Sequence, residues 1–226
     1  MSLDALADHP HGVVRVVSIP DDTPPTEVLS ALLPEEQAFA ATLSPLRRGT
    51  WVAGRLALAS ALTSIGAPRT SMLSTPRGAP SLPRGFAGSV SHKRRMAVAL
   101  AALDTGAGLG VDLEELVAGA HDISRKILTT AELAIVDAGS SQDRFREVLV
   151  RFSIKESIYK AVDPFVQRYV GFKEAEVDPG PWSDGIQMAR AQLSLEQGEG
   201  PFAVEGAWVE IGGHVISSAR VRPANG

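Results

Sequence analysis

The stretch LGVDLEEL, residues 109–116, follows a run of turn residues and carries the carboxylates Asp112 and Glu114 two residues apart. Its length and apolar content predict a strand. Successive side chains of a strand point to opposite faces, so Asp112 and Glu114 share one face and Glu115 points to the other. Two carboxylates on one face suit a hard cation such as Mg²⁺, which prefers oxygen ligands. A solvated strand face is the alternative interpretation.

A second stretch, FSIKESIYKA at residues 152–161, lies in a segment with helical spacing of apolar residues. We expect this helix to end before Pro164, because the residue that precedes a proline disfavours helical geometry. Glu156 and Lys160 are four residues apart and share a face, so a surface ion pair is the simple interpretation. Lys155 lies beside them and could reach a common ligand with its long stem.

The rest of the chain predicts a mixture of short strands and helices. The β-branched run at residues 13–19 predicts a strand, and the apolar run at 96–103 predicts another that pairs with 109–116 as a hairpin. Helices are predicted from Pro34, and from Ser44 and Pro45 to Gly66. Thr129 and Glu132 have capping-box spacing, which predicts a helix from about residue 130. Short β-like runs fill the remainder.

Several cationic side chains have candidate roles in phosphate binding. His92 ends the segment GSVSH, residues 88–92, which follows a loop and is expected to start a strand. Hydroxyls, imidazole and backbone N–H groups could contact phosphate there. Arg48 and Arg55 are seven apart along one predicted helix, and Arg47 precedes them. An arginine as deep in an apolar helix as Arg55 needs an anionic partner, which could be a carboxylate or a ligand phosphate.

Composition excludes several classes of protein. The chain has 226 residues and no cysteine, so disulfides, thiolate metal sites and a cysteine nucleophile are excluded. Its net charge of −4 does not indicate nucleic acid. No apolar stretch is long enough for a membrane span, and the first residues lack a signal pattern, so we expect a cytoplasmic protein without a membrane partner. The length fits one large domain or two small ones, and a boundary in the turn at residues 104–108 gives two lobes, residues 1–105 and 106–226.

Four segments together resemble the 4′-phosphopantetheinyl transferase superfamily, in particular its surfactin-type and enterobactin-type branch. They are GVDLE at 110–114, FSIKESIYKA at 152–161, Gly54-Arg55 before an alanine-rich helix, and Gly78-Ala79-Pro80 followed by GSVSH. Phe152 and Ser157 stand where the family often has tryptophan and alanine, two positions that support packing.

The resemblance implies an α+β fold, a pseudo-dimer of two similar α/β lobes with the active site between them. Residues 1–105 would form the lobe on the coenzyme A side, and residues 106–226 the lobe with the metal and catalytic motifs. The implied enzyme is of the holo-acyl-carrier-protein synthase type, and it acts as a monomer on apo acyl or peptidyl carrier proteins. It transfers the 4′-phosphopantetheine of coenzyme A to a carrier serine and releases 3′,5′-ADP. Mg²⁺ is the implied cofactor, and Mn²⁺ is a possible substitute.

The resemblance also implies roles for individual residues. The implied metal ligands are Asp112, Glu114 and Glu156, of which Glu156 also helps to deprotonate the carrier serine. The catalytic set is Glu156, Lys160 and His92. The residues expected to hold coenzyme A are Arg47, Arg48, Arg55, Arg77, Ser91, His92, Lys155 and Lys160. For docking of an acidic carrier, we expect Arg125 and Lys126 to contribute.

Two other functions fit the residues less completely. A Mg²⁺-dependent nucleotide hydrolase would use the carboxylates but has no need of the Lys155–Lys160 helix or of GSVSH. A non-catalytic subunit that binds coenzyme A or a carrier would be favoured by a missing carboxylate, and none is missing. The carriers served, whether of polyketide, non-ribosomal peptide, siderophore or fatty-acid pathways, stay open.

Overall fold

The computed structural model describes residues 2–6, 8–18, 26–94, 96–117, 122–140 and 143–224. The chain divides into two compact units, Met1–Thr105 and Gly106–Gly226. Each unit contains one antiparallel sheet and one long helix packed on it, which confirms the predicted α+β class. Within the described ranges, every helix is too short or too polar to cross a membrane.

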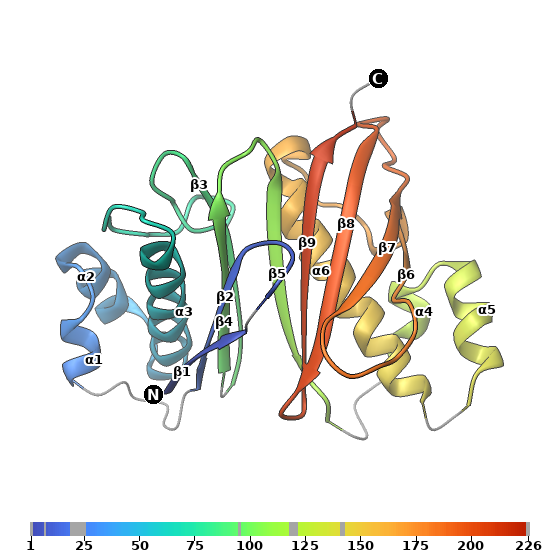
Figure 1. Cartoon of the computed structure of the whole chain (residues 1–226), viewed down its shortest axis with the longest axis horizontal. Helices are drawn as coiled ribbons and strands as arrows, with labels where there is room; N and C mark the ends of the chain where they lie inside the picture. The colour runs from blue at the N-terminus through green and yellow to red at the C-terminus, as the bar shows by residue number, and fades with distance from the viewer. Residues whose placement is uncertain are drawn as a thin grey trace. The chain divides into compact units, whose positions relative to one another are not determined.

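Unit 1 is built on a four-stranded sheet of order β1-β2-β4-β3. The long helix α3 packs across β2, β4 and β3 (Figure 1). Small side chains of the helix, such as Ala53, Ala57 and Ala61, are fully buried against the sheet, so helix and strands approach closely. The elements are β1 (Ser2–Leu6), β2 (Val13–Ser18), α1 (Thr26–Ser30), α2 (Pro34–Thr42), α3 (Pro45–Ser64), β3 (Phe86–Lys93) and β4 (Met96–Leu103).

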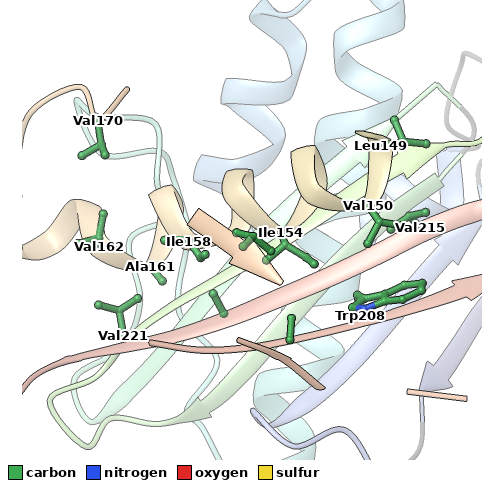
Figure 2. Packing of buried hydrophobic residues seen from close by; sticks show 13 residues of the cluster. Leu149, Val150, Ile154, Ile158, Ala161, Val162, Val170, Trp208, Val215 and Val221 are labelled. Atoms are coloured by element: carbon green, nitrogen blue, oxygen red, sulfur yellow. The ribbon is translucent and has the colours of Figure 1, made fainter. Parts of the chain in front are cut away.

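Unit 2 is built on a five-stranded sheet of order β5-β9-β8-β7-β6. The long helix α6 packs on β5 and β9, and Figure 2 shows its apolar side chains Val150, Ile154 and Ile158 facing those of the strands. The elements are β5 (Gly108–Glu115), α4 (Ser124–Ile127), α5 (Thr130–Ala138), α6 (Arg144–Val166), a 3₁₀ turn η1 (Phe172–Glu174), β6 (Ala175–Asp178), β7 (Gln187–Leu193), β8 (Phe202–Ile211) and β9 (His214–Pro223).

The two units repeat one connectivity. In unit 1 a strand, β2, precedes the long helix α3 and the hairpin β3–β4, and β4 returns to pair with β2. In unit 2, β5 precedes α6 and the hairpin β8–β9, and β9 returns to pair with β5. This repetition agrees with the predicted pair of similar lobes. The expected place of the active site stays a prediction.

The predicted hairpin of residues 96–103 with 109–116 is wrong. Lys93 pairs directly with Met96, so β4 turns back along β3 and uses one of its edges there. Its other edge pairs with β2, from Val13 opposite Ala101 to Ser18 opposite Met96. With both edges of β4 paired, β5 cannot join it, and β5 pairs with β9 instead.

Helix α6 also continues past Pro164, where the sequence predicted that it would end. A proline removes one backbone donor and costs helix stability, yet Phe165 and Val166 pack against the apolar core of unit 2. The helix ends two residues later, where Gln167 takes a left-handed conformation with φ of 51° and donates its N–H to Asp163 O at 2.9 Å. Tertiary packing thus outweighs the local preference of proline.

Candidate functional site

Two glycines let helix α6 lie directly on strand β5. A Cβ atom at Gly110 would lie 1.8 Å from the carbonyl oxygen of Ser157, and one at Gly108 would lie 1.8 Å from that of Ala161. No other residue type fits at this approach. Since side chains alternate along a strand, the next positions on the same face are Asp112 and Glu114. The glycine pattern therefore places the predicted carboxylates on the face of β5 that carries the helix.

Asp112 is held at both of its carboxylate oxygens by α6. Its Oδ1 accepts a hydrogen bond from Lys160 Nζ at 2.8 Å, and its Oδ2 accepts one from Ser153 Oγ at 3.0 Å. Lys160 Nζ also donates to the carbonyl oxygen of Val111 at 2.9 Å. The structure thus joins Asp112 of the strand to Lys160 of the helix as an ion pair. Asp112 is only 4 % exposed, so this pair is shielded from water on the carboxylate side.

The donor chemistry around Asp112 fits Mg²⁺. The Lys160 ammonium lies among oxygen atoms of Asp112 and Val111, which shows that positive charge is accommodated there. Glu114 lies on the same strand face and is 9 % exposed, and Glu156 is half-buried on α6. In the described part of the chain, no three His, Asp or Glu side chains form a ready metal cage. Mg²⁺ often binds through one or two carboxylates, waters and substrate phosphates, so a cage is not required.

Lys155 does not have the environment of a phosphate ligand. Its side chain is fully buried, and its ammonium donates to Glu132 Oε2 at 2.6 Å, to Ile127 O at 2.8 Å and to Phe172 O at 3.0 Å. An ammonium has three N–H bonds, and all three are used within unit 2. Burial lowers the pKa of Lys155, and Glu132 opposes that shift. These contacts favour a structural role for Lys155, and its predicted contact with coenzyme A stays a prediction.

The sequence did not reveal that Glu132 is the ion-pair partner of Lys155. The capping box with Thr129 is present as predicted, with Thr129 N donating to Glu132 Oε2 at 2.7 Å. The other oxygen, Oε1, accepts from Val177 N at 2.7 Å, so one carboxylate joins α5, α6 and β6. The spacing that predicted the cap gave no sign of the buried ion pair, because the lysine partner comes from a distant helix.

Among the described residues of unit 1, Arg55 has a buried donor without a hydrogen-bond partner. The residue is 5 % exposed, its guanidinium carbon lies 4.7 Å from the ring centroid of Trp51, and its Nη2 donates to Ser74 Oγ at 3.2 Å. The Arg55 Nε and Trp51 Nε1 donors are buried without a hydrogen-bond partner among the described residues. Burial lowers the pKa of Arg55 to about 10, so it is still charged at neutral pH. A buried charge with a spare donor is suited to an anionic ligand.

Arg48 has a structural role that the sequence did not predict. Its Nε donates to Ala40 O at 2.9 Å, and its Nη2 donates to Ala41 O and Leu43 O at 3.1 Å each. These carbonyl groups lie at the C-terminal end of α2, where a cation is favourable. The predicted contact of Arg48 with coenzyme A thus competes with its role as a helix cap, whereas Arg47 in the same turn of α3 is exposed.

The loop after α3 positions Arg77 in relation to Arg55. Ser74 and Pro80 form a β-bridge, and Thr75 N donates to Ala79 O at 2.7 Å, so the exposed Arg77 lies in a closed turn. Arg55 donates to Ser74 at the base of this turn, so a hydrogen bond connects Arg55 to the loop that carries Arg77.

Ser91 and His92 lie within β3, near its end and not at the start of a strand, where the sequence places them. A Cβ atom at Gly88 would lie 3.3 Å from Leu58 Cδ1, and one at Gly54 would lie 2.8 Å from Val90 Cγ1. Each step of two residues on β3 therefore matches about one turn of α3 toward its N-terminus. This register places the exposed His92 level with the first turns of α3 and on the α3 side of the sheet, while Ser91 faces the opposite side.

Comparisons with known proteins agree with these motifs. The family model of the 4′-phosphopantetheinyl transferase N-terminal domain matches residues 35–102, and that of the 4′-phosphopantetheinyl transferase superfamily matches residues 108–205. The chain is 31 % identical over 212 residues to 4′-phosphopantetheinyl transferase Svp of Streptomyces mobaraensis, covering 87 % of this chain and 81 % of that protein. The chain belongs to the 4′-phosphopantetheinyl transferase superfamily.

Two further relatives of this transferase carry the same description. Npt of Nocardia iowensis is 26 % identical over 198 residues, which covers 82 % of this chain and 87 % of Npt. PptT of Mycobacterium tuberculosis is 27 % identical over 197 residues, which covers 82 % of this chain and 84 % of PptT. The first family match includes Arg55, Arg77 and His92 of the transferase, and the second includes Asp112 and Lys160.

Proposed function

We propose that this transferase moves the 4′-phosphopantetheine group of coenzyme A to a serine of an apo carrier protein, in a Mg²⁺-dependent reaction that releases 3′,5′-ADP. The observation that carries the proposal is the junction of β5 and α6. There, Asp112 is held at both oxygens and paired with Lys160 at 2.8 Å, on the strand face that also carries Glu114. A hard cation and a phosphate both find complementary charge at such a junction.

The predicted metal ligands, Asp112, Glu114 and Glu156, supply only oxygen donors. When bound, Mg²⁺ would neutralise charge on the pyrophosphate of coenzyme A, and Mn²⁺ could substitute. Lys160 has a role of its own, because its side chain is partly exposed and its ammonium lies beside the Asp112 carboxylate. From there it can donate to a phosphate oxygen and stabilise the charge that develops on the leaving group.

Glu156 is the proposed base of the reaction. A serine hydroxyl is a weak nucleophile and must lose its proton during the attack on phosphorus. Glu156 is half-buried on α6, one helical turn before Lys160, so its carboxylate is accessible to a hydroxyl or to a bridging water.

The adenylate end of coenzyme A has candidate ligands in unit 1. Arg55 combines a buried charge with an unsatisfied Nε donor among the described residues, and it is connected through Ser74 to the turn that carries Arg77. Arg47 and His92 are exposed near the first turns of α3, where the helix dipole also favours an anion. We propose that these four residues bind the 3′-phosphate and the neighbouring phosphates.

The carrier protein is proposed to dock on α4 while the transferase acts as a monomer. Arg125 and Lys126 are exposed on this short helix, and Ile127 and Leu128 beneath them are 1 % and 2 % exposed. The buried pair fixes the backbone of α4, so the two cations project from a rigid base toward solvent. Carriers of this type tend to be acidic around the target serine, which gives complementary charge.

The test is a transfer assay with the purified chain, coenzyme A, Mg²⁺ and a panel of apo carrier proteins. Transfer adds one phosphopantetheine to the carrier mass, and a carrier whose target serine is changed to alanine stays unmodified. Glu156→Gln and Asp112→Asn should abolish transfer while the circular dichroism spectrum stays that of the wild type. Hydrolysis of coenzyme A without a gain of carrier mass would instead support a nucleotide hydrolase, and binding without turnover would support a non-catalytic subunit.

A further inference from the structure

We propose that Ser153 and Ser217 form a buried hydroxyl pair that fixes the orientation of the Asp112 carboxylate for cation binding. This inference rests on the proposed function, because it assumes that Asp112 binds the metal. Both serines are 0 % exposed. Neither side chain reaches solvent, and the pair meets the predicted metal ligand Asp112 through Ser153, so its role is to position that residue.

Three elements meet at this pair. Ser217 of β9 lies directly opposite Asp112 of β5 in the antiparallel register, so the two side chains share a sheet face. Ser153 approaches from α6 and contacts both, with Oγ 3.0 Å from Asp112 Oδ2 and 2.8 Å from Ser217 Oγ. The approach is possible because Gly110, two residues before Asp112, has no side chain under the helix.

The number of hydroxyl protons decides which serine of the pair donates to the other. The hydroxyl groups of Ser153, Ser217 and Ser157 have one proton each, but they take part in four contacts. Two of these contacts have acceptor-only partners, because Ser153 donates to the ionised Asp112 and Ser157 donates to Ile154 O at 2.8 Å. The proton that remains is that of Ser217, which can donate either to Ser153 Oγ at 2.8 Å or to Ser157 Oγ at 3.2 Å.

The shorter contact is the one that takes the proton. Without it, two hydroxyl oxygens would face each other at 2.8 Å with no proton between them, and their lone pairs would repel. The chain of hydrogen bonds therefore runs from Ser217 to Ser153 to Asp112, and each bond polarises the next. The ionised carboxylate receives the aligned dipoles of both hydroxyls.

The consequence is a carboxylate that cannot rotate. Lys160 holds Oδ1 and Ser153 holds Oδ2, so the plane of the Asp112 carboxylate is fixed and the remaining lone pairs have defined directions. Hydrogen-bond partners behind a metal ligand commonly alter metal affinity by about 10- to 100-fold. Ser153 should therefore contribute to cation affinity without touching the cation.

The experiment measures Mn²⁺ binding from the free Mn²⁺ signal in electron paramagnetic resonance, with saturating coenzyme A and no carrier protein. Ser153→Ala should weaken Mn²⁺ binding about 10-fold, and Ser217→Ala should weaken it less, because it acts through Ser153. Ser157→Ala is the matched control, since it removes a buried hydroxyl of the same helix that contacts Ser217 but not Asp112, and so removes only the longer contact, which receives no proton. Ser153→Cys retains a weak donor and should restore part of the affinity.

The outcomes separate the inference from the function on which it rests. If Asp112→Asn leaves Mn²⁺ affinity unchanged, the metal assignment fails and the proposal fails with it. If Asp112→Asn weakens Mn²⁺ binding but Ser153→Ala behaves like Ser157→Ala, only the positioning role is overturned. Should Ser153→Ala not fold, the ranking of Ser153→Cys and Ser217→Ala against Ser157→Ala decides the question in the same way.

Discussion

Replacement of Lys155 by methionine separates its two possible roles. The structure buries the ammonium completely and surrounds it with Glu132 and two backbone carbonyl groups. Methionine has a similar length and lacks the charge, so the change removes three hydrogen bonds and little volume. If the structural role is correct, the loss should appear in stability. If Lys155 binds a phosphate, it should appear in the affinity for coenzyme A.

The expected loss of folding free energy follows from the charge that the substitution leaves buried. Glu132, which is 1 % exposed, would keep its two backbone donors, Thr129 N and Val177 N, but would lose its counter-charge. Removing one partner of a buried ion pair typically costs about 3–5 kcal/mol, because the other charge stays buried and uncompensated. Against a typical stability of about 5–15 kcal/mol for a domain, this is a large fraction.

The double variant Lys155→Met with Glu132→Gln gives a sharper test. It removes both charges, so its loss should be well below the sum of the single losses, and the difference measures their coupling. Urea unfolding followed by tryptophan fluorescence gives the free energies, with Trp182 and Trp208 as reporters in unit 2. Lys126→Met is the control, because this exposed lysine should change stability by less than about 0.5 kcal/mol.

One combination of results would contradict the structural role of Lys155. A Lys155→Met protein with wild-type stability and a much weaker affinity for coenzyme A would place the ammonium on a phosphate. The burial and the three contacts would then describe a state that the ligand replaces.

The remaining predictions concern ligand, carrier and pH. Arg55→Gln should weaken coenzyme A binding by about 1.5–3 kcal/mol, measured by calorimetry, but should leave dephospho-coenzyme A almost unaffected, and equal losses would contradict contact with the 3′-phosphate. Charge reversal at Arg125 and Lys126 should raise the KM for the carrier and not that for coenzyme A, and should reduce the salt dependence of the carrier KM. The Arg168 hydrogen bond lowers the pKa of Glu174 to about 2 from 4.5, so the stability it contributes should be complete above about pH 4.5 and lost as pH falls toward 2. Urea unfolding at a series of pH values should show this loss in the wild type and a flatter profile in Glu174→Gln.

The core of unit 2 was predictable because a short sequence encodes it. Alternation along a strand places Gly108, Gly110, Asp112 and Glu114 on one face, and the first two can only be glycine where a helix backbone touches the strand. The capping box at Thr129 was equally local, and it is present. The shared face of the carboxylates and the capping box depend on neighbours within a few residues, so they can be inferred from one sequence, whereas the contact of the two glycines with α6 cannot.

The pairing of strands was harder to predict from the sequence. Residues 96–103 and 109–116 are neighbours in sequence and each has strand character, which favours a hairpin. The structure shows instead that the alternative partner of β4, the strand β3 that precedes it, is paired along its full length from Phe86 to Lys93. The sequence around residue 88 read as the end of a loop because of its glycines and prolines, so the competing strand was underestimated.

The roles of the two lysines of α6 were also hard to predict from the sequence. Lys155 and Lys160 occupy one helix and both resemble phosphate ligands by residue type, yet the first is fully buried and the second partly exposed. Their difference of five positions turns them to different sides of α6, one toward Ile127 and Phe172 and the other toward Val111. Residue type and spacing indicate which side chains could bind phosphate, but only the partners of the helix decide which of them face it.

Two sides of helix α6 have different roles. One side of the helix carries Lys155, which uses every donor on fixed internal partners and contributes stability. The side toward β5 carries Ser153 and Lys160, which converge on the two oxygens of Asp112. The hydrogen bonds of Lys155 restrain rotation of the helix about its axis. The contacts with Asp112 depend on that restraint, because a small rotation would move Ser153 or Lys160 away from the carboxylate oxygen that it contacts. A variant that weakens the Lys155–Glu132 pair should therefore also weaken cation binding at Asp112, although the two groups share no atom.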